Sequence, residues 1–156
     1  MPIISPTVSD PHHDIALVVS VFNEEITKNL WQAAHQTLLD AGYSEEQIYT
    51  VWVPGAVEIP LMTKILLSSG RFAGAIGLGA VIRGDTDHYN YVCQQVSYGC
   101  QKVSLMSGYP VMFGVLTTEN EEQAYARSAA NENNKGAEAA HALLSFLSVI
   151  EQTEAL

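Results

Sequence analysis

GAVIRGDTDHYNYV, residues 79–92, joins the two kinds of element that alternate along the chain. The apolar run over residues 74–82 predicts a buried strand, which breaks at Arg83-Gly84. A polar turn, residues 85–87, then leads into a helical pattern, with His88 at the junction. The N-terminus of a helix presents free backbone N–H groups that favour an anion, and an imidazole beside it can transfer protons. The stretch therefore predicts either a phosphate-type pocket beside His88 or, more simply, a capped helix with a surface histidine.

Length and composition limit what surrounds this stretch. The chain has 156 residues, which fits one domain, and 47% of them are apolar while only 15% are charged. So few charges favour a surface that is partly buried against other subunits, although apolar surface is common in monomers too. The formal charge of −10, with only seven Lys plus Arg, argues against nucleic acid, which needs clustered basic residues. An anionic small molecule is still possible where two or three cations converge.

Residues 1–13 are expected to form an extended N-terminal arm, followed by one α/β domain over residues 14–156. The arm lacks the basic start and apolar segment of a signal peptide, and no apolar run approaches the roughly 20 residues of a membrane span. Cys93 and Cys100 would lie about 10 Å apart in one helix, too far for a disulfide. We therefore expect a cytoplasmic protein with reduced thiols. Adjacent histidines without further ligands, such as His12-His13, are usually solvent-exposed, so no metal site is expected.

Strands and helices are predicted to alternate from residue 15 onward. Unbroken apolar runs predict strands over residues 15–22, 47–53, 73–82 and 110–117. Helical patterns follow each of them, the first capped by Asn23 and the last two beginning at Thr118 and Lys135. This βαβ order predicts an α/β fold in which helices cover both faces of a parallel sheet.

Ligands bind such sheets at the carboxyl ends of the strands. Polar or aromatic side chains follow every predicted strand at that rim: Phe22 and Asn23 after the first, Glu58 after the second, residues 83–88 after the third, and Thr117-Thr118 after the fourth. Phe113 lies within the fourth strand. Because the rim collects these side chains from four separate segments, it is the expected place for a functional site.

Five ordered motifs carry a resemblance to a known family: FN (22–23), VPGAVEIP (53–60), GAVIRGDTDHYNYV (79–92), PVMFGVLTTENEEQAYAR (110–127) and NKGAEAA (134–140). Together the motifs resemble the lumazine synthases of riboflavin biosynthesis, from Ile15 to Leu147. The resemblance implies a flavodoxin-like, three-layer α/β/α sandwich with a four-stranded parallel sheet. It also implies a transferase that condenses 5-amino-6-(D-ribitylamino)uracil with 3,4-dihydroxy-2-butanone 4-phosphate to 6,7-dimethyl-8-ribityllumazine. Phosphate and water are released, and no cofactor or metal takes part.

The same resemblance implies pentamers, or multiples of pentamers, with active sites shared between neighbouring subunits and a possible functional link to riboflavin synthase. His88 would shuttle protons. The amides of Asp85 and Thr86 would hold the phosphate together with Arg127. The aminouracil and its ribityl chain would be bound by Phe22, Asn23, Ala56, Val57, Glu58, Ala80, Val81 and Ile82, and by Phe113 and Lys135, with Phe113, Arg127 and Lys135 reaching in from the adjacent subunit.

Simpler roles remain open for three of these residues. Phe22 could belong to the core, Glu58 could cap a nearby helix, and Arg127 could pair on its helix surface with Glu121 or Glu122. The family scaffold could also serve a lumazine or flavin carrier that has lost catalysis, and the fold alone could serve another phosphosugar-handling enzyme.

Two departures from the family pattern stand out. Residue 85 is often small in the family, whereas the carboxylate of Asp85 would repel a phosphate. We therefore expect Asp85 to cap the following helix by accepting N–H bonds from residue 87 or 88. The segment SAANEN (128–133) lacks the glycines of many shell-forming members, which puts larger shells in doubt.

Overall fold

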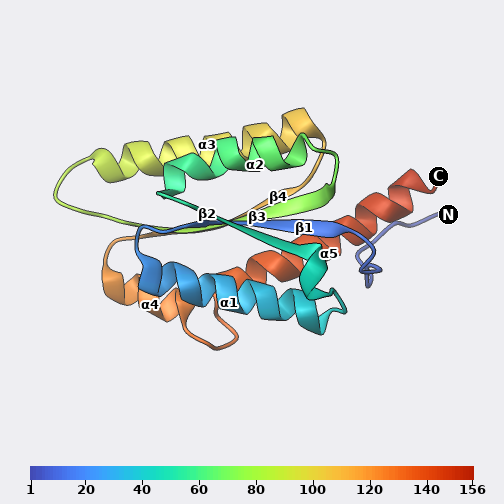
Figure 1. The fold of residues 1–156 in the computed structure, drawn as a ribbon, viewed down its shortest axis with the longest axis horizontal. Coiled ribbons are helices and arrows are strands. Elements are labelled where there is room, and N and C mark those ends of the chain that lie inside the picture. Colours follow the sequence, from blue (N-terminus) through green and yellow to red (C-terminus); the bar gives the residue numbers. More distant parts are fainter.

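A four-stranded parallel sheet lies at the centre of the computed structural model, which describes residues 1–156 (Figure 1). The strands lie in the order β2-β1-β3-β4. Their bounds are β1 (Asp14–Ser20), β2 (Ile48–Val53), β3 (Phe72–Ile82) and β4 (Val111–Thr118). The sheet confirms the predicted α/β, flavodoxin-like architecture.

Helices cover both faces of the sheet. One layer contains α1 (Glu24–Asp40), α4 (Glu121–Ser128) and α5 (Lys135–Glu154), and the other contains α2 (Ile59–Leu67) and α3 (His88–Ser107) (Figure 1). Short 3₁₀ turns, η1 (Glu45–Gln47) and η2 (Ala56–Glu58), precede β2 and α2. No helix of the chain combines the length and apolar character that a membrane span requires.

The apolar strand sequences follow from burial on both faces. In β1, Leu17 and Val19 pack in the cluster beneath α1 and α5, whereas Val18 packs in the cluster beneath α2 and α3. All three are fully buried. A strand with two covered faces has to be apolar at successive positions, which is why the predicted strands show continuous apolar runs.

The strand order creates a crevice at one end of the sheet. β1 pairs with β2 on one side and with β3 on the other. The chain therefore leaves β1 towards β2 and leaves β3 towards β4, in opposite directions along the sheet. Parallel sheets bind ligands at such a point, outside the carboxyl ends of the strands. At the far side of the sheet β4 pairs only with β3, which leaves its outer edge open within the chain.

The first strand ends earlier than predicted, and Asn23 explains why. β1 ends at Ser20 rather than at Phe22. Asn23 has a left-handed backbone (φ 64°), which turns the chain out of the sheet and into α1. Asn23 occupies the predicted N-cap position, but its side chain caps no helix nitrogen, so that part of the prediction was wrong. Its amide Nδ2 instead donates a 2.8 Å hydrogen bond to the carbonyl oxygen of Ala80.

Residues 1–13 form no helix and no strand, and part of this arm is hydrogen-bonded to α5. The backbone nitrogen of Thr7 donates to Ser148 Oγ over 2.9 Å, and Ser9 Oγ donates to a carboxylate oxygen of Glu151 over 2.9 Å. Both α5 residues lie in the last two turns of the helix, so the arm is fixed to the C-terminal end of α5.

Candidate active site

A cavity of about 380 Å³ lies in the crevice at the carboxyl ends of β1 and β3. We call it the crevice cavity. Phe22 lines it with a side chain that is 70% exposed, so the alternative that Phe22 belongs to the core is wrong. The cavity is mainly apolar, and His88 is its titratable imidazole. Its lining residues are Phe22, Gly55, Ala56, Val57, Ala80, Val81, Ile82, Gly84, Thr86, His88, Tyr89 and Val92.

Glu58 lies beside this cavity and is exposed. Its Oε2 would be only 3.2 Å from a Cβ at Gly55, a residue of the cavity wall. Glu58 occupies the N-cap position of α2, yet its side chain makes no cap hydrogen bond. The helix-cap alternative is therefore wrong, and the carboxylate is available to accept hydrogen bonds from a bound molecule.

The turn before α3 leaves backbone donors free. The backbone nitrogens of Asp85, Thr86 and Asp87 donate to no group of the chain, while that of His88 donates to Thr86 Oγ1 over 3.3 Å. The hydroxyl of Thr86 thus makes the contact that we expected from Asp85. Asp85 accepts no hydrogen bond, and the prediction that it caps α3 was wrong because the residue next to it fills that place.

Arg83 ties this turn to the neighbouring strand. Its backbone nitrogen donates to the carbonyl oxygen of Thr118 over 2.9 Å, and its Nε lies 2.8 Å from Glu119 Oε2. The guanidinium carbon lies 4.4 Å from the ring centre of Tyr89, and Nη2 donates to Asn90 Oδ1 over 3.2 Å. These contacts hold the start of α3 against the end of β4.

Tyr89 is a cavity residue that the sequence reasoning missed. Burial, followed by the nearby thiol of Cys93, raises the pKa of its hydroxyl. Tyr89 follows His88 directly in the DHY motif, but an aromatic residue at a helix start gives no signal that separates a cavity wall from core packing.

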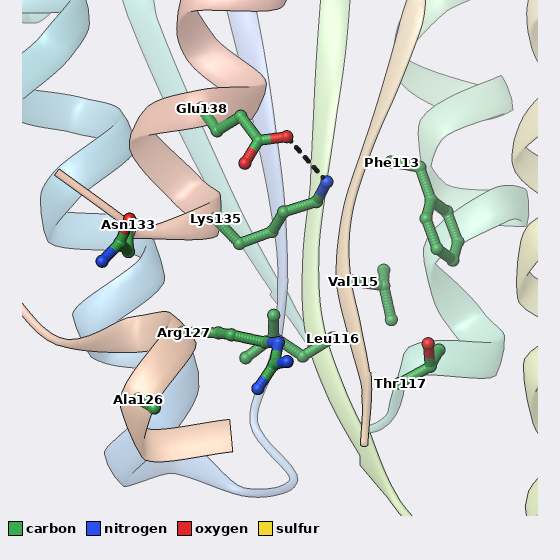
Figure 2. Close-up of a pocket in the computed structure, with 9 residues that line it drawn as sticks. All are labelled: Phe113, Val115, Leu116, Thr117, Ala126, Arg127, Asn133, Lys135 and Glu138. Atoms are coloured by element: carbon green, nitrogen blue, oxygen red, sulfur yellow. Dashed lines mark hydrogen bonds and ion pairs between the residues drawn. The ribbon is translucent and has the colours of Figure 1, made fainter. Parts of the chain in front are cut away.

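A second cavity, of about 640 Å³, lies along the open edge of β4 (Figure 2). We call it the edge cavity. Lys135 and Arg127 project towards β4 from the side of α4 and α5, while Phe113 and Thr117 lie on the other side of the strand. Its lining residues are Phe113, Val115, Leu116, Thr117, Ala126, Arg127, Asn133, Lys135 and Glu138.

The two cations of the edge cavity have different partners. Lys135 Nζ lies 3.1 Å from Glu138 Oε1. Arg127 donates from Nη1 to the carbonyl oxygen of Gln123 over 3.1 Å and pairs with no carboxylate. The alternative pairing of Arg127 with Glu121 or Glu122 is therefore wrong, and its charge is free to meet an anion.

The two cavities share no lining residue and differ in chemistry. The crevice cavity offers an aromatic ring, an imidazole and free backbone donors, and the edge cavity offers two cations. Together they contain eleven of the fourteen predicted site residues. The other three, Asn23, Glu58 and Asp85, adjoin the crevice cavity without lining it.

Comparison with known proteins gives one consistent result. A family model described as 6,7-dimethyl-8-ribityllumazine synthase matches residues 12–151. A protein of that name from Coxiella burnetii is 51% identical over 140 residues, covering 90% of this chain and 93% of the relative. Another from Levilactobacillus brevis is 48% identical over 142 residues (91% and 90%), and one from Leuconostoc mesenteroides is 42% identical over 149 residues (96% and 96%).

The chain belongs to the 6,7-dimethyl-8-ribityllumazine synthase family. It is accordingly an enzyme of riboflavin biosynthesis in the transferase class, as the motifs predicted.

The NKG motif of this lumazine synthase family member has a distinct physical reason at each position. Asn134 is 2% exposed, and its Oδ1 accepts hydrogen bonds from the nitrogens of Gly136 (2.8 Å) and Ala137 (3.2 Å), which caps α5. Its Nδ2 donates to the carbonyl oxygen of Ser128 over 2.9 Å. Gly136 lies against the backbone of Leu30, so closely that any Cβ would overlap the Leu30 carbonyl. The cap and the close contact with α1 fix the position of Lys135, the first residue of α5.

Asn134, Asn133 and Glu138 were missed as contributors to this region. The last helix was predicted to begin at Lys135 with no role for Asn134, whereas the structure buries Asn134 as the cap of that helix. An asparagine directly before a lysine-glycine helix start was the available signal, because Asn is a preferred N-cap. For Asn133 and Glu138 the sequence contains no such signal, because Asn and Glu are common on any protein surface.

Proposed function

We propose that the enzyme forms 6,7-dimethyl-8-ribityllumazine by condensing 5-amino-6-(D-ribitylamino)uracil with 3,4-dihydroxy-2-butanone 4-phosphate, with no cofactor or metal. The observation that carries this proposal is the crevice cavity, where an exposed phenylalanine and an imidazole adjoin three unpaired backbone N–H groups. The phenylalanine ring can stack on an aromatic substrate, and the free N–H groups can bind the phosphate of the other substrate.

The aminouracil is proposed to bind in the crevice cavity. Its ring stacks on Phe22, and the backbone of residues 80–82 hydrogen-bonds its polar edge. The ribityl chain lies over residues 56–58, where the carboxylate of Glu58 accepts hydroxyl hydrogen bonds. Asn23 holds the Ala80 carbonyl from the other side, which positions this edge of the cavity.

The phosphate is proposed to sit at the start of α3. The free nitrogens of Asp85 and Thr86 donate to it, and the helix N-terminus favours its charge. The guanidinium of Arg127, unpaired with any carboxylate, adds two parallel hydrogen bonds. Donors of this kind bind a dianion yet still let it leave, as the reaction requires.

His88 is proposed to move the protons. An amine of the aminouracil adds to the ketone carbon, and loss of water leaves an imine. Loss of a proton from the adjacent carbon then expels phosphate and leaves an enol, which tautomerises to a second ketone. The second nitrogen adds to that ketone carbon, and loss of a second water closes the ring. Each step takes a proton from nitrogen or carbon and delivers one to a leaving oxygen. His88 lines the crevice cavity directly after the turn that is proposed to hold the phosphate, which supports this role.

The complete site is proposed to form between neighbouring subunits of a pentamer. Phe113, Arg127 and Lys135 of one subunit would close the crevice cavity of the next. The separation of the two cavities supports this arrangement, as do exposed apolar side chains on α2 and α3. These are Leu61, Ile65, Tyr91, Tyr98, Leu105 and Met106, each at least 55% exposed in the single chain. The enzyme is further proposed to be cytoplasmic, which its two free cysteines support.

Mixing both substrates and following lumazine fluorescence tests the reaction. A carrier without catalysis would bind lumazine and form none. The unpaired charge of Arg127 favours the enzyme, because a carrier of a neutral ring needs no anion site. Light scattering of the purified protein gives the assembly size.

Refolded mixtures of two variants test the shared site. His88→Ala and Arg127→Ala place their defects in different cavities. If sites form between subunits, random assembly regenerates about a quarter of them with both halves intact. The mixture is then more active than the mean of its parents. A mixture no better than that mean would show that each site lies within one subunit.

A further inference from the structure

Three potential metal ligands meet at the end of the sheet opposite the active site. His12 and His13 directly precede β1, and Glu151 lies near the end of α5. One ligand atom from each lies within 4.8 Å of the other two. Figure 1 shows the N-terminal arm passing this end of α5. We propose that His12, His13 and Glu151 bind a divalent transition cation, with Zn²⁺ as the best match.

The donor set fits that chemistry. Two imidazoles and one carboxylate are a recognised ligand set for Zn²⁺, with water completing a tetrahedral site. The sequence provides only the adjacent histidines. The fold adds the carboxylate from 138 positions along the chain. The rings of His12 and His13 lie with their centres 3.7 Å apart, so both imidazoles face the same side of the backbone.

Hydrogen bonds outside the ligand set orient two of the three groups. His12 Nδ1 lies 3.0 Å from the carbonyl oxygen of Asp10. Because a carbonyl only accepts, Nδ1 carries the proton, and the lone pair of Nε2 is free to bind a cation. Ser9 Oγ donates to Glu151 Oε1 over 2.9 Å and holds the carboxylate in place. Partners of this kind fix the tautomer and direction of metal ligands.

The space and distances accommodate an ion with small movements. His13 Nε2 lies 2.6 Å from Glu151 Oε1. Bonds of about 2.0–2.2 Å to one tetrahedral Zn²⁺ would set these atoms about 3.4 Å apart, so the pair has to open by less than 1 Å. The proton between the two atoms is released to solvent as Zn²⁺ binds. A cavity of about 460 Å³ adjoins the three ligands and is also lined by Glu154, which leaves room for bound water.

A second histidine–glutamate pair serves as a matched control. His35 Nε2 lies 2.8 Å from Glu45 Oε2, much like the His13–Glu151 pair. It lacks a third ligand, since the chain contains only one group of three potential metal ligands. Both pairs should attract a cation weakly through the carboxylate. Only the group with the third ligand should bind it tightly.

Calorimetric titration of the untagged, chelator-washed protein with Zn²⁺ at neutral pH tests the proposal. We expect saturable binding of one Zn²⁺ per chain. His12→Ala, His13→Ala and Glu151→Gln should each weaken it at least tenfold, and His35→Ala should leave it unchanged. His12→Ala is the decisive variant, because it keeps the His13–Glu151 contact and hence the arm. The proposal is wrong if the wild type shows no saturable binding, or if His12→Ala and Glu151→Gln bind Zn²⁺ as the wild type does.

Protection of the arm provides a second readout. The three ligands join residues 12–13 to α5, so Zn²⁺ should slow proteolytic cleavage within residues 1–13. The slowing should occur in the wild type and in His35→Ala and be absent in His12→Ala. Equal slowing in His12→Ala would contradict the assigned ligands.

Discussion

The side-chain nitrogen of Asn23 donates to the carbonyl oxygen of Ala80 over 2.8 Å, which joins the end of β1 to the end of β3. The same asparagine holds the left-handed backbone that turns the chain into α1. One residue therefore sets both the exit of β1 and the position of the Ala80 carbonyl beneath the crevice cavity.

Two substitutions separate these two contributions. Asn23→Gly keeps the left-handed backbone and loses only the hydrogen bond, which should lower the free energy of unfolding by about 1 kcal/mol. Asn23→Ala loses the bond and adds about 1–2 kcal/mol of backbone strain. Urea unfolding should therefore rank the proteins wild type, Gly, then Ala. Equal losses in the two variants would mean that the backbone conformation carries no cost.

His88→Ala should slow the reaction without abolishing it. General acid–base help typically contributes about 10²–10⁴-fold, whereas positioning two bound reactants can contribute roughly 7–11 kcal/mol of barrier. The second contribution does not depend on the imidazole. Steady-state lumazine formation should show a lower kcat with little change in either KM. Complete loss of activity in a folded variant that still binds both substrates would contradict the expectation that positioning alone sustains part of the rate.

Arg127→Ala should act on one substrate only. Because the guanidinium meets no carboxylate in the chain, its charge is available to the phosphate. Removing a charge-assisted hydrogen bond of this kind costs about 1.5–3 kcal/mol, or roughly 10–100-fold in the KM of the phosphorylated ketone. The KM of the aminouracil should stay within about twofold.

Arg71→Ala is the matched control for Arg127→Ala. Arg71 pairs with Asp14 at 2.9 Å, at the other end of the sheet. It should change neither KM. An increase in the KM of both substrates in Arg127→Ala would indicate a collapsed edge cavity instead of a lost phosphate contact.

Gly136→Ala should destabilise the contact between α1 and α5. A Cβ at this position would overlap the backbone of Leu30, which belongs to a helix and cannot move alone. Overpacking typically costs about 1–3 kcal/mol, and a backbone clash should reach the upper end. Gly84→Ala is the control, because nothing lies within 4 Å of its added Cβ and the backbone there is unstrained. It should change stability by less than about 0.5 kcal/mol.

The strands and the rim of the active site could be predicted because a buried strand has a recognisable apolar sequence. A strand covered on both faces is apolar throughout, so β1 and β3 stand out as runs. The rim then follows from the common direction of parallel strands. Phe22, Thr86 and His88 were placed correctly at one cavity by this reasoning alone.

Contacts between distant segments could not be predicted in the same way. Asn23 was expected to cap its own helix, and its partner instead lies 57 positions away. Asp85 and Thr86 are neighbours with similar capping ability, and only the path of the turn decides that Thr86 Oγ1 meets the nitrogen of His88. His12 and His13 lacked a third ligand until α5 brought Glu151 to them.

The stability of the enzyme should fall at alkaline pH because of two buried groups. Burial raises the pKa of the Cys100 thiol from 9.0 to about 11. Burial, with a further contribution from the charge of Glu151, raises the pKa of Tyr43 from 10.0 to about 12. Above the ordinary values the folded chain holds more protons than the unfolded chain, so the free energy of unfolding decreases as pH rises. The stabilisation is complete below pH 9 and is lost between about pH 9 and 12.

Tyr43→Phe isolates the contribution of the phenol. The hydroxyl of Tyr43 is buried and has no hydrogen-bond partner, so its removal should raise the free energy of unfolding at neutral pH by about 1 kcal/mol. The variant should also lose stability less steeply than the wild type above about pH 10, where the phenol of the unfolded chain ionises. Urea midpoints at neutral pH and at two alkaline pH values measure both effects. A variant that is less stable at neutral pH would show that the hydroxyl has a partner after all, and an unchanged alkaline slope would assign the whole effect to Cys100.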